Sequence, residues 1–148
     1  MDLLLDTNVL IDFLSRREPF YQNAVKLFAA GAFGDVRLWV PVQSLCDAFY
    51  VMRKHVDPQK LQRMIARVCD VVTPVDLTSQ DASRALQLAW PDYEDCLISL
   101  AAEKAKARFL VTRDADGFTR SSVPTISPEG LLSMLQKQMS VCYDEVLL

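Results

Sequence analysis

Four aspartates stand at points in the chain where a carboxylate needs a specific reason: Asp6, Asp47, Asp95 and Asp114. Asp6 follows the apolar run Leu3–Leu5, which is typical of a buried parallel strand. Asp114 follows a second such run, Phe109–Thr112. Acids that end neighbouring parallel strands meet at one crevice, at the carboxyl edge of the sheet. Asp95, in the first turn of a predicted helix, can reach the same crevice.

Such a cluster of carboxylates favours a divalent cation. Like charges within a few ångströms raise one another's pKa, so several acids in one pocket are best explained by Mg²⁺ or Mn²⁺. Carboxylate sites bind these ions with several waters left in place, and those waters can act as nucleophile and as a bridge to phosphate. The chemistry that this predicts is phosphodiester hydrolysis.

Purely structural explanations exist for two of these regions. Asp6 can simply begin a turn in which Thr7 or Asn8 caps the following helix. Asp92 and Asp95 can be the N-cap residue and the third residue of a helix, where an acid complements the helix dipole.

The other two regions have similar alternatives. Asp114 and Asp116 can be ordinary turn residues. Asp47 lies about 200° around its helix from Leu45 and so points away from the core face on which Leu45 lies. Individually these explanations are as good as the functional one. Taken together, acids that end two central strands favour a site.

Apolar patterning predicts the elements that position these acids. Strands are expected at 3–5, 37–40, 71–75, 109–112 and 123–126, the last at a sheet edge because it contains a proline. Helices are expected at about 9–14, 20–30, 41–55, 58–68, 79–90, 91–106 and 131–139, with Gly31 as a C-cap. Strands alternating with helices predict the α/β class, with a central parallel sheet covered by helices on both faces. One domain over 1–140 is expected, with 141–148 as a tail or as part of the same domain.

Composition narrows the class of protein. The chain has 148 residues, 51% of them hydrophobic and 24% charged, which predicts one globular domain. No apolar run approaches the ~20 residues of a membrane helix, and the acidic start is not a signal peptide, so we expect a cytoplasmic protein without a membrane span. A net charge of -3 argues against a basic groove for nucleic acid.

Cysteine spacing disfavours a zinc site or a disulfide framework. The four cysteines lie far apart, without a CxxC pair, and only one histidine could join them. We therefore expect most of them to be buried thiols.

Three motifs together resemble the PIN domain family and its VapC-like toxin ribonucleases. They are Leu-Leu-Leu-Asp6-Thr7-Asn8, then Asp92-Tyr-Glu-Asp95-Cys-Leu, then Phe109-Leu-Val-Thr112-Arg-Asp114 with Phe118. They occur in the family's order and span nearly the whole chain. The resemblance implies a single PIN-like domain that hydrolyses RNA with Mg²⁺ or Mn²⁺, as the toxin of a toxin–antitoxin pair.

Carried over by position, the resemblance assigns roles to individual residues. Asp6, Asp95 and Asp114 would be metal ligands, and Asp47 would complete the catalytic acids. The family usually has glutamate where this chain has Asp47, so Asp47 binds metal through water or not at all, and Asp92 is a substitute for it. Asp116 is an alternative to Asp114. The residues that would shape the site are Thr7, Asn8 and Thr112.

The resemblance also implies partners. These are an RNA substrate, an antitoxin protein and a second copy of the chain in a homodimer. The groove between the helices at 20–30 and 41–55 is the expected antitoxin site, with Phe28 and Phe49 as its test positions. Weaker candidates for RNA contact are the arginines Arg16, Arg17, Arg113 and Arg120, since surface arginines often only promote solubility.

Two other interpretations compete with the nuclease. In the first, Asp47 weakens metal binding and the protein is a PIN-like module that binds RNA or a protein partner without cutting. In the second, the protein is a phosphoryl-accepting receiver domain, which also has acids at strand ends. Receivers normally have an acidic pair after strand one and a lysine after a late strand, where this chain has Asp6-Thr7 and Thr112-Arg113.

Overall fold

The computed structural model describes residues 1–146; residues 147–148, the end of the predicted tail, lie outside the described part. Five parallel strands form one sheet in the order β3-β2-β1-β4-β5. Their bounds are β1 Asp2–Leu5, β2 Arg37–Pro41, β3 Val72–Val75, β4 Phe109–Val111 and β5 Thr125–Ile126. The α/β class and the edge position of the last strand are confirmed.

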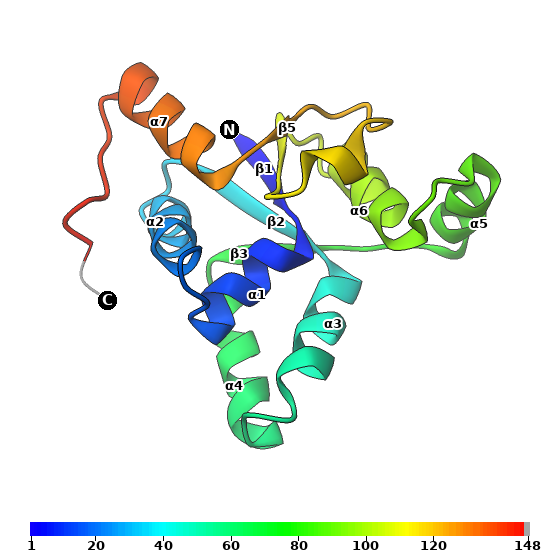
Figure 1. Ribbon diagram of the computed structural model, residues 1–148, viewed down its shortest axis with the longest axis horizontal. Helices are drawn as coiled ribbons and strands as arrows, with labels where there is room; N and C mark the ends of the chain where they lie inside the picture. Colours follow the sequence, from blue (N-terminus) through cyan, green and yellow to red (C-terminus); the bar gives the residue numbers. More distant parts are fainter. Residues whose placement is uncertain (147–148) are drawn as a thin grey trace.

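Seven α-helices and a short 3₁₀ helix, η1, connect and cover the strands within the described residues (Figure 1). Their bounds are α1 Thr7–Ser15, α2 Tyr21–Ala32, α3 Val42–Met52, α4 Pro58–Val68, α5 Ser79–Leu88, α6 Tyr93–Lys104, η1 Ala115–Phe118 and α7 Pro128–Met139. The sequence patterns placed each α-helix within a few residues of its observed position.

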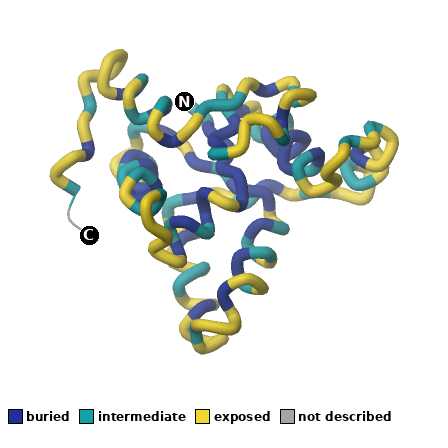
Figure 2. Tube along the Cα trace, viewed as in Figure 1, coloured by how far each residue is buried: buried dark blue, intermediate teal, exposed yellow. Residues whose placement is uncertain are grey.

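The core has two layers because neighbouring residues of β1 face opposite sides of the sheet. Leu3 and Leu5 pack in the larger cluster, with α1, α2, α3 and α7. Leu4 packs on the other face, with Ile98 of α6. All three leucines are fully buried, and Figure 2 shows the central strands as the most buried part of the trace. An uninterrupted apolar run is what a central strand covered on both faces requires.

Gly31 corrects one prediction. It does not cap α2 but lies inside its last turn, and Phe33 is the C-cap. A Cβ at Gly31 would lie 2.7 Å from Cδ1 of Leu38 on β2. The glycine is therefore explained by close approach of α2 to the sheet, a tertiary contact that local sequence does not reveal.

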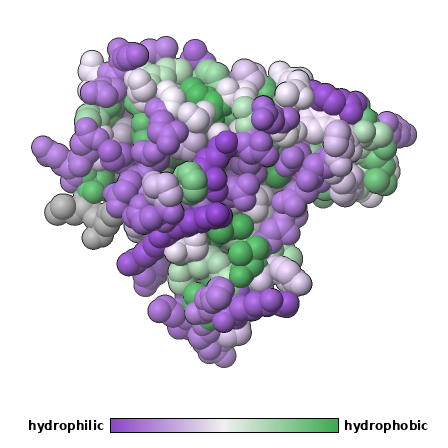
Figure 3. All heavy atoms as spheres, in the orientation of Figure 1, coloured by the Kyte–Doolittle hydropathy of each residue, from purple (hydrophilic) through white to green (hydrophobic). Residues whose placement is uncertain are grey.

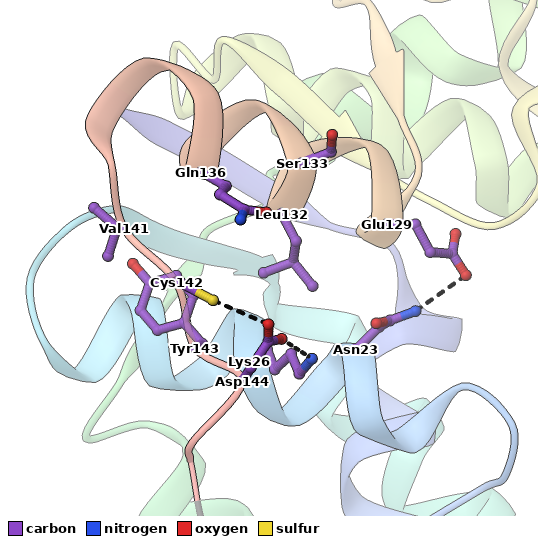
Figure 4. A pocket seen from close by; sticks show the side chains of 10 residues that line it. All are labelled: Asn23, Lys26, Glu129, Leu132, Ser133, Gln136, Val141, Cys142, Tyr143 and Asp144. Atoms are coloured by element: carbon purple, nitrogen blue, oxygen red, sulfur yellow. Dashed lines mark hydrogen bonds and ion pairs between the residues drawn. The ribbon is translucent and has the colours of Figure 1, made fainter.

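The segment after α7 packs against α2 (Figure 4). The hydroxyl of Tyr143, a buried residue, donates to Oδ2 of Asp35 at 2.6 Å, and Lys26 forms an ion pair with Asp144. Val146 packs against the main core cluster. Through residue 146 this segment is in contact with the domain.

The structure bears on two predictions from composition, that of no membrane span and that of buried cysteines. Within residues 1–146, none of the helices is long and apolar enough to cross a membrane. The expectation of buried thiols is wrong for three of the four cysteines: Cys96 is buried, but Cys46, Cys69 and Cys142 are exposed. Cys46 lies on the exposed side of α3, Cys69 is the C-cap of α4, and Cys142 lies in the segment after α7.

Candidate active site

The site is built on the ends of β1 and β4. Asp6 follows β1 and is buried, and its backbone N–H donates to the carbonyl of Val111 at 2.9 Å. Thr112, also buried, follows β4 and donates its hydroxyl to Oδ2 of Asp6 at 2.7 Å. The same hydroxyl oxygen accepts the backbone N–H of Asp114 at 2.9 Å. Thr112 thus joins the two aspartates that the sequence placed at neighbouring strand ends.

Helix α3 is tied to this edge by a buried hydrogen bond. Thr7 Oγ1 and Ser44 Oγ lie 2.7 Å apart, which connects the first residue of α1 to the first turn of α3. Asp47 lies three residues after Ser44 and so on the same side of α3, about one turn along. This explains why Asp47 is half-buried and faces the site although it points away from the core.

Helix α6 brings the remaining acids. Asp92 is its N-cap and accepts the backbone N–H of Asp95 at 3.1 Å. The structural explanation for Asp92 is therefore correct, yet its side chain also lines the cleft, together with Glu94 and Asp95. One residue can serve both roles because a capping carboxylate uses one oxygen for the helix and leaves the other free.

These elements enclose an open cleft of about 410 Å³. Its walls are Asp6, Thr7, Asn8, Ile11, Asp47, Tyr50, Val51, Asp92, Glu94, Asp95 and Asp114. Six of these residues are acids, and none is a lysine, arginine or histidine. The lining therefore contains no side-chain cation to balance the carboxylates.

Burial and the neighbouring negative charges together raise the pKa of the central acids. Burial is the main reason that the pKa of Asp6 is raised, against hydrogen bonds from Thr112 and from the backbone N–H groups of Thr7 and Asn8. Burial, followed by the charges of Asp92, Asp6 and Asp114, raises the pKa of Asp95 to about 6.

Glu94 carries the largest of these shifts within the cleft. Desolvation of its carboxyl group, then the charge of Asp47 and a hydrogen bond between the two carboxyls, raise its pKa to about 7. Two carboxyl groups can share a hydrogen bond only while one of them holds a proton. In the metal-free protein near neutral pH, a fraction of the Glu94 side chains therefore holds a proton.

Gly117, in η1, lies against two acids of the cleft, Asp95 and Asp114. A Cβ at this position would lie 2.6 Å from Oδ2 of Asp95 and 3.2 Å from Oδ2 of Asp114. Any side chain here would displace one or both carboxylates. The glycine therefore sets how closely the carboxylates of α6 and of the β4 end approach.

The donor set fits Mg²⁺ or Mn²⁺, which prefer carboxylate oxygens and keep several waters. Among residues 1–146, however, no three acid, histidine or cysteine side chains are already arranged as direct ligands of one ion. An ion would be held by Asp6, Asp95 and Asp114 after small side-chain movements, or through waters.

The secondary candidates from the sequence differ in whether they line the cleft. Thr7 and Asn8 line the cleft, and Thr112 supports Asp6 from below. Asp114 and Asp116 are both exposed, but only Asp114 lines the cleft, so the geometry favours Asp114 as the fourth acid.

Arg113 is engaged inside the protein. Its Nε and Nη2 donate to the two carboxylate oxygens of buried Asp12 at 2.7 and 3.2 Å, and its Cζ lies 3.7 Å from the ring centroid of Phe20. The pair joins the end of β4 to α1. A buried carboxylate requires such a partner. The guanidinium of Arg113 is already paired with Asp12. RNA contact by Arg113 stays a prediction.

The other three arginines lie at helix ends. Arg120 donates to the carbonyls of Leu88 and Ala89 at 2.8 and 3.4 Å, at the C-terminus of α5. Arg16 is the exposed C-cap of α1, and Arg17 next to it is also exposed. None of the three lines the acidic cleft.

Sequence reasoning did not identify Ser44, Glu94 or Gly117 as parts of the site. Glu94 lies inside the Asp-Tyr-Glu-Asp motif, so its position beside two aspartates was an available signal. Ser44 stands one helical turn before Asp47, which is a weaker signal. Nothing local distinguishes Gly117, because its role depends on the approach of a helix from elsewhere in the chain.

Comparison with known proteins identifies the family. A family profile described as the PIN domain matches residues 2–116. The chain therefore belongs to the PIN domain family, which confirms the resemblance found in its motifs. No curated protein sequence matches the chain significantly.

Solved structures show the same fold at low sequence identity. VapBC2 from Rickettsia felis, bound to a DNA fragment from its promoter, matches with a TM-score of 0.62 and 17% identity over 86% of this chain and 98% of that chain. PAE2754 from Pyrobaculum aerophilum gives a TM-score of 0.63 and 18% identity over 93% and 97%. FitAB bound to the IR36 DNA fragment gives 0.57 and 18% over 85% and 94%.

The receiver-domain interpretation is excluded by topology and by family. Flavodoxin-like folds, which include receivers, have the strand order 2-1-3-4-5. This chain has 3-2-1-4-5 and the PIN domain match.

Proposed function

We propose that the protein is a Mg²⁺- or Mn²⁺-dependent endoribonuclease and the toxin component of a toxin–antitoxin pair. The observation that carries this proposal is the single cleft in which six carboxylates converge without a side-chain cation. Membership of the PIN domain family and the VapBC and FitAB structural neighbours support the same activity and setting.

The ions would supply charge neutralisation for the phosphate and a water activated for in-line attack. Asp6, Asp95 and Asp114 would hold them, and Thr112 fixes the Oδ2 atom of Asp6 by its hydrogen bond. Asp47 and Glu94 line the same cleft, where a carboxylate can order water.

An antitoxin partner would bind away from the cleft lining. The sequence suggested a groove between α2 and α3. The structure instead has an apolar groove of about 500 Å³ lined by α1, α2 and α4. Phe28 lines it and Phe49 does not, because α1 lies between α2 and α3. We therefore propose this groove as the antitoxin site, with Phe28 as the test position in place of Phe49.

The test is cleavage of single-stranded and structured RNAs by the purified, partner-free protein with Mg²⁺ or Mn²⁺. Wild type is compared with a chelator control and with Asp6→Asn, which keeps size and shape but removes a ligand charge. We expect metal-dependent cutting that Asp6→Asn reduces by more than about 100-fold, since loss even of an outer partner of a metal site costs about 10- to 100-fold.

An Asp116→Asn variant is the matched control, because Asp116 lies in the same turn as Asp114 but outside the cleft. It should cut like wild type. A folded wild-type protein that cuts none of these RNAs, or an Asp6→Asn variant as active as wild type, would instead support the non-cutting module that binds RNA or a protein.

A further inference from the structure

Helix α3 continues from the acidic cleft to an exposed aromatic residue and a basic helix end. Tyr50 and Val51 follow Asp47 by three and four residues, so all three lie on one side of the helix. All three line the cleft. In the space-filling view, an apolar area lies where α1 and α3 come together, bordered by hydrophilic surface (Figure 3).

Tyr50 is one of the most exposed large side chains of the described residues, with 63% of its surface accessible. Burial in the core therefore does not explain its aromatic ring. The guanidinium of Arg53 lies 4.0 Å from the ring centroid, within the range of a cation–π contact. That contact orients the ring from one side, and the exposed fraction leaves the other side open.

The charges along this side of α3 change sign. Asp47 lies at the cleft, whereas Arg53 and Lys54 are exposed at the C-terminal end of the helix. Lys60, at the start of α4, is exposed as well. A nucleic acid strand leaving the acidic cleft would meet an aromatic ring first and positive charges next, which is the combination that binds single strands.

We propose that Tyr50 and Arg53 form a nucleotide-binding subsite for single-stranded RNA beside the cleft. A base stacks on the open face of Tyr50, and the adjoining phosphates contact Arg53 and Lys54. The proposal rests on RNA being the substrate, and it adds a preference for unpaired substrate, because a base inside a duplex has no free face to stack.

Binding to a short single-stranded RNA with a fluorescent adenine analogue tests the subsite. The full chain is used in the Asp6→Asn background with Mg²⁺, so that the RNA stays intact. We expect Tyr50→Ala to weaken binding about tenfold and to abolish the stacking-dependent quenching of the analogue, within the range for one aromatic–base contact. Tyr50→Phe should bind within about twofold of its parent, because the ring remains.

Phe33→Ala is the matched control, since Phe33 is an equally exposed aromatic residue, 69% accessible, that does not line the cleft. It should leave RNA binding and quenching unchanged. A duplex of the same sequence should bind Tyr50→Ala and its parent equally.

The subsite is contradicted if Tyr50→Ala binds the single strand as its parent does, or if Phe33→Ala loses as much affinity. It is also contradicted if Tyr50→Ala alters only self-association, measured by sedimentation, because Tyr50 would then belong to a protein interface. Cleavage by the protein with an intact Asp6 is measured separately. If the wild-type protein cuts RNA but Tyr50→Ala does not weaken binding, only the subsite is refuted. If the wild-type protein does not cut RNA but Tyr50→Ala weakens binding, only the nuclease activity is refuted.

Discussion

Strand β1 has an aspartate at each end, and their surroundings shift the pKa values of the two carboxyl groups in opposite directions. At the amino end, Asp2 accepts hydrogen bonds from Nη2 of Arg37 at 2.7 Å and Nε1 of Trp39 at 2.9 Å. Burial acts to raise the pKa of Asp2, but these hydrogen bonds and the Arg37 charge outweigh it, and the pKa is lowered. At the carboxyl end, burial dominates and the pKa of Asp6 is raised.

We interpret the difference as that between a structural acid, Asp2, and the proposed metal ligand, Asp6. Asp2 is supplied with donors and a counter-charge by the adjacent strand β2, so its negative charge stabilises the fold. Asp6 has only a hydroxyl and backbone N–H groups, and its nearest charged neighbours are acids. Clusters of acids with raised pKa values are a mark of functional sites. Among residues 1–146, the acids with raised pKa values are Asp6, Glu94 and Asp95, at the carboxyl edge of the sheet.

After Asp6→Asn, the largest expected effect at the carboxyl edge comes from Gly117→Ala. The added Cβ would collide with Oδ2 of Asp95, so we expect Mn²⁺ affinity, measured by titration calorimetry, to fall about 10- to 100-fold. The free energy of unfolding without metal should change by less than about 1 kcal/mol, because the carboxylate can swing into the open cleft.

Ala115→Ser is the control for that variant, as an exposed position of the same 3₁₀ turn. It should bind Mn²⁺ like wild type. Equal affinities for Gly117→Ala and wild type would mean that Asp95 and Asp114 do not hold the ion together.

Neutralising one acid at each edge should change stability in opposite directions. In chelator at neutral pH, we expect Asp2→Asn to lower the free energy of unfolding by about 1 kcal/mol, through loss of charged hydrogen bonds to Arg37 and Trp39. Asp95→Asn should raise it by about 1 kcal/mol, since it removes a charge from a repelling cluster. Urea unfolding measures both, and changes of the same sign would remove the distinction between the two edges.

The smallest expected effect is a pH dependence of the metal-free protein. The folded pKa of Glu94, about 7, lies above its ordinary value of 4.5, so the folded state holds more protons between these values. The free energy of unfolding should therefore fall as pH rises through this window. We expect the melting temperature to fall with it by a few degrees. Asp95, with a pKa of about 6, adds to the same trend.

Glu94→Gln should flatten that pH profile, and added Mg²⁺ should do the same in wild type by compensating the charges. Asp70→Asn, at an exposed acid after α4, should leave the profile unchanged. Parallel profiles for Glu94→Gln and wild type, recorded by differential scanning fluorimetry, would show that Glu94 does not titrate in this window.

Much of the fold was predictable because its signals are local. Leu3–Leu5 is apolar without alternation, as a central strand must be, and proline marked β5 as an edge strand. The expected neighbours β1 and β4 do pair, and they bring Asp6 and Asp114 to one edge. The limits were contacts between distant segments. Gly31 resembled a C-cap, but its packing against Leu38 of β2 explains it better.

The sequence by itself determined the acids, their order and the strands that they follow, because hydrophobic period and motif order are written along the chain. Only the tertiary structure decided which acids share a cleft, since that depends on how α3 and α6 meet the sheet. It placed Asp114 and Glu94 in the cleft lining and left Asp116 outside it. It also paired Arg113 with Asp12. Carboxylate repulsion, burial and counter-charge act through space, and their balance is set by which side chains the fold brings within a few ångströms.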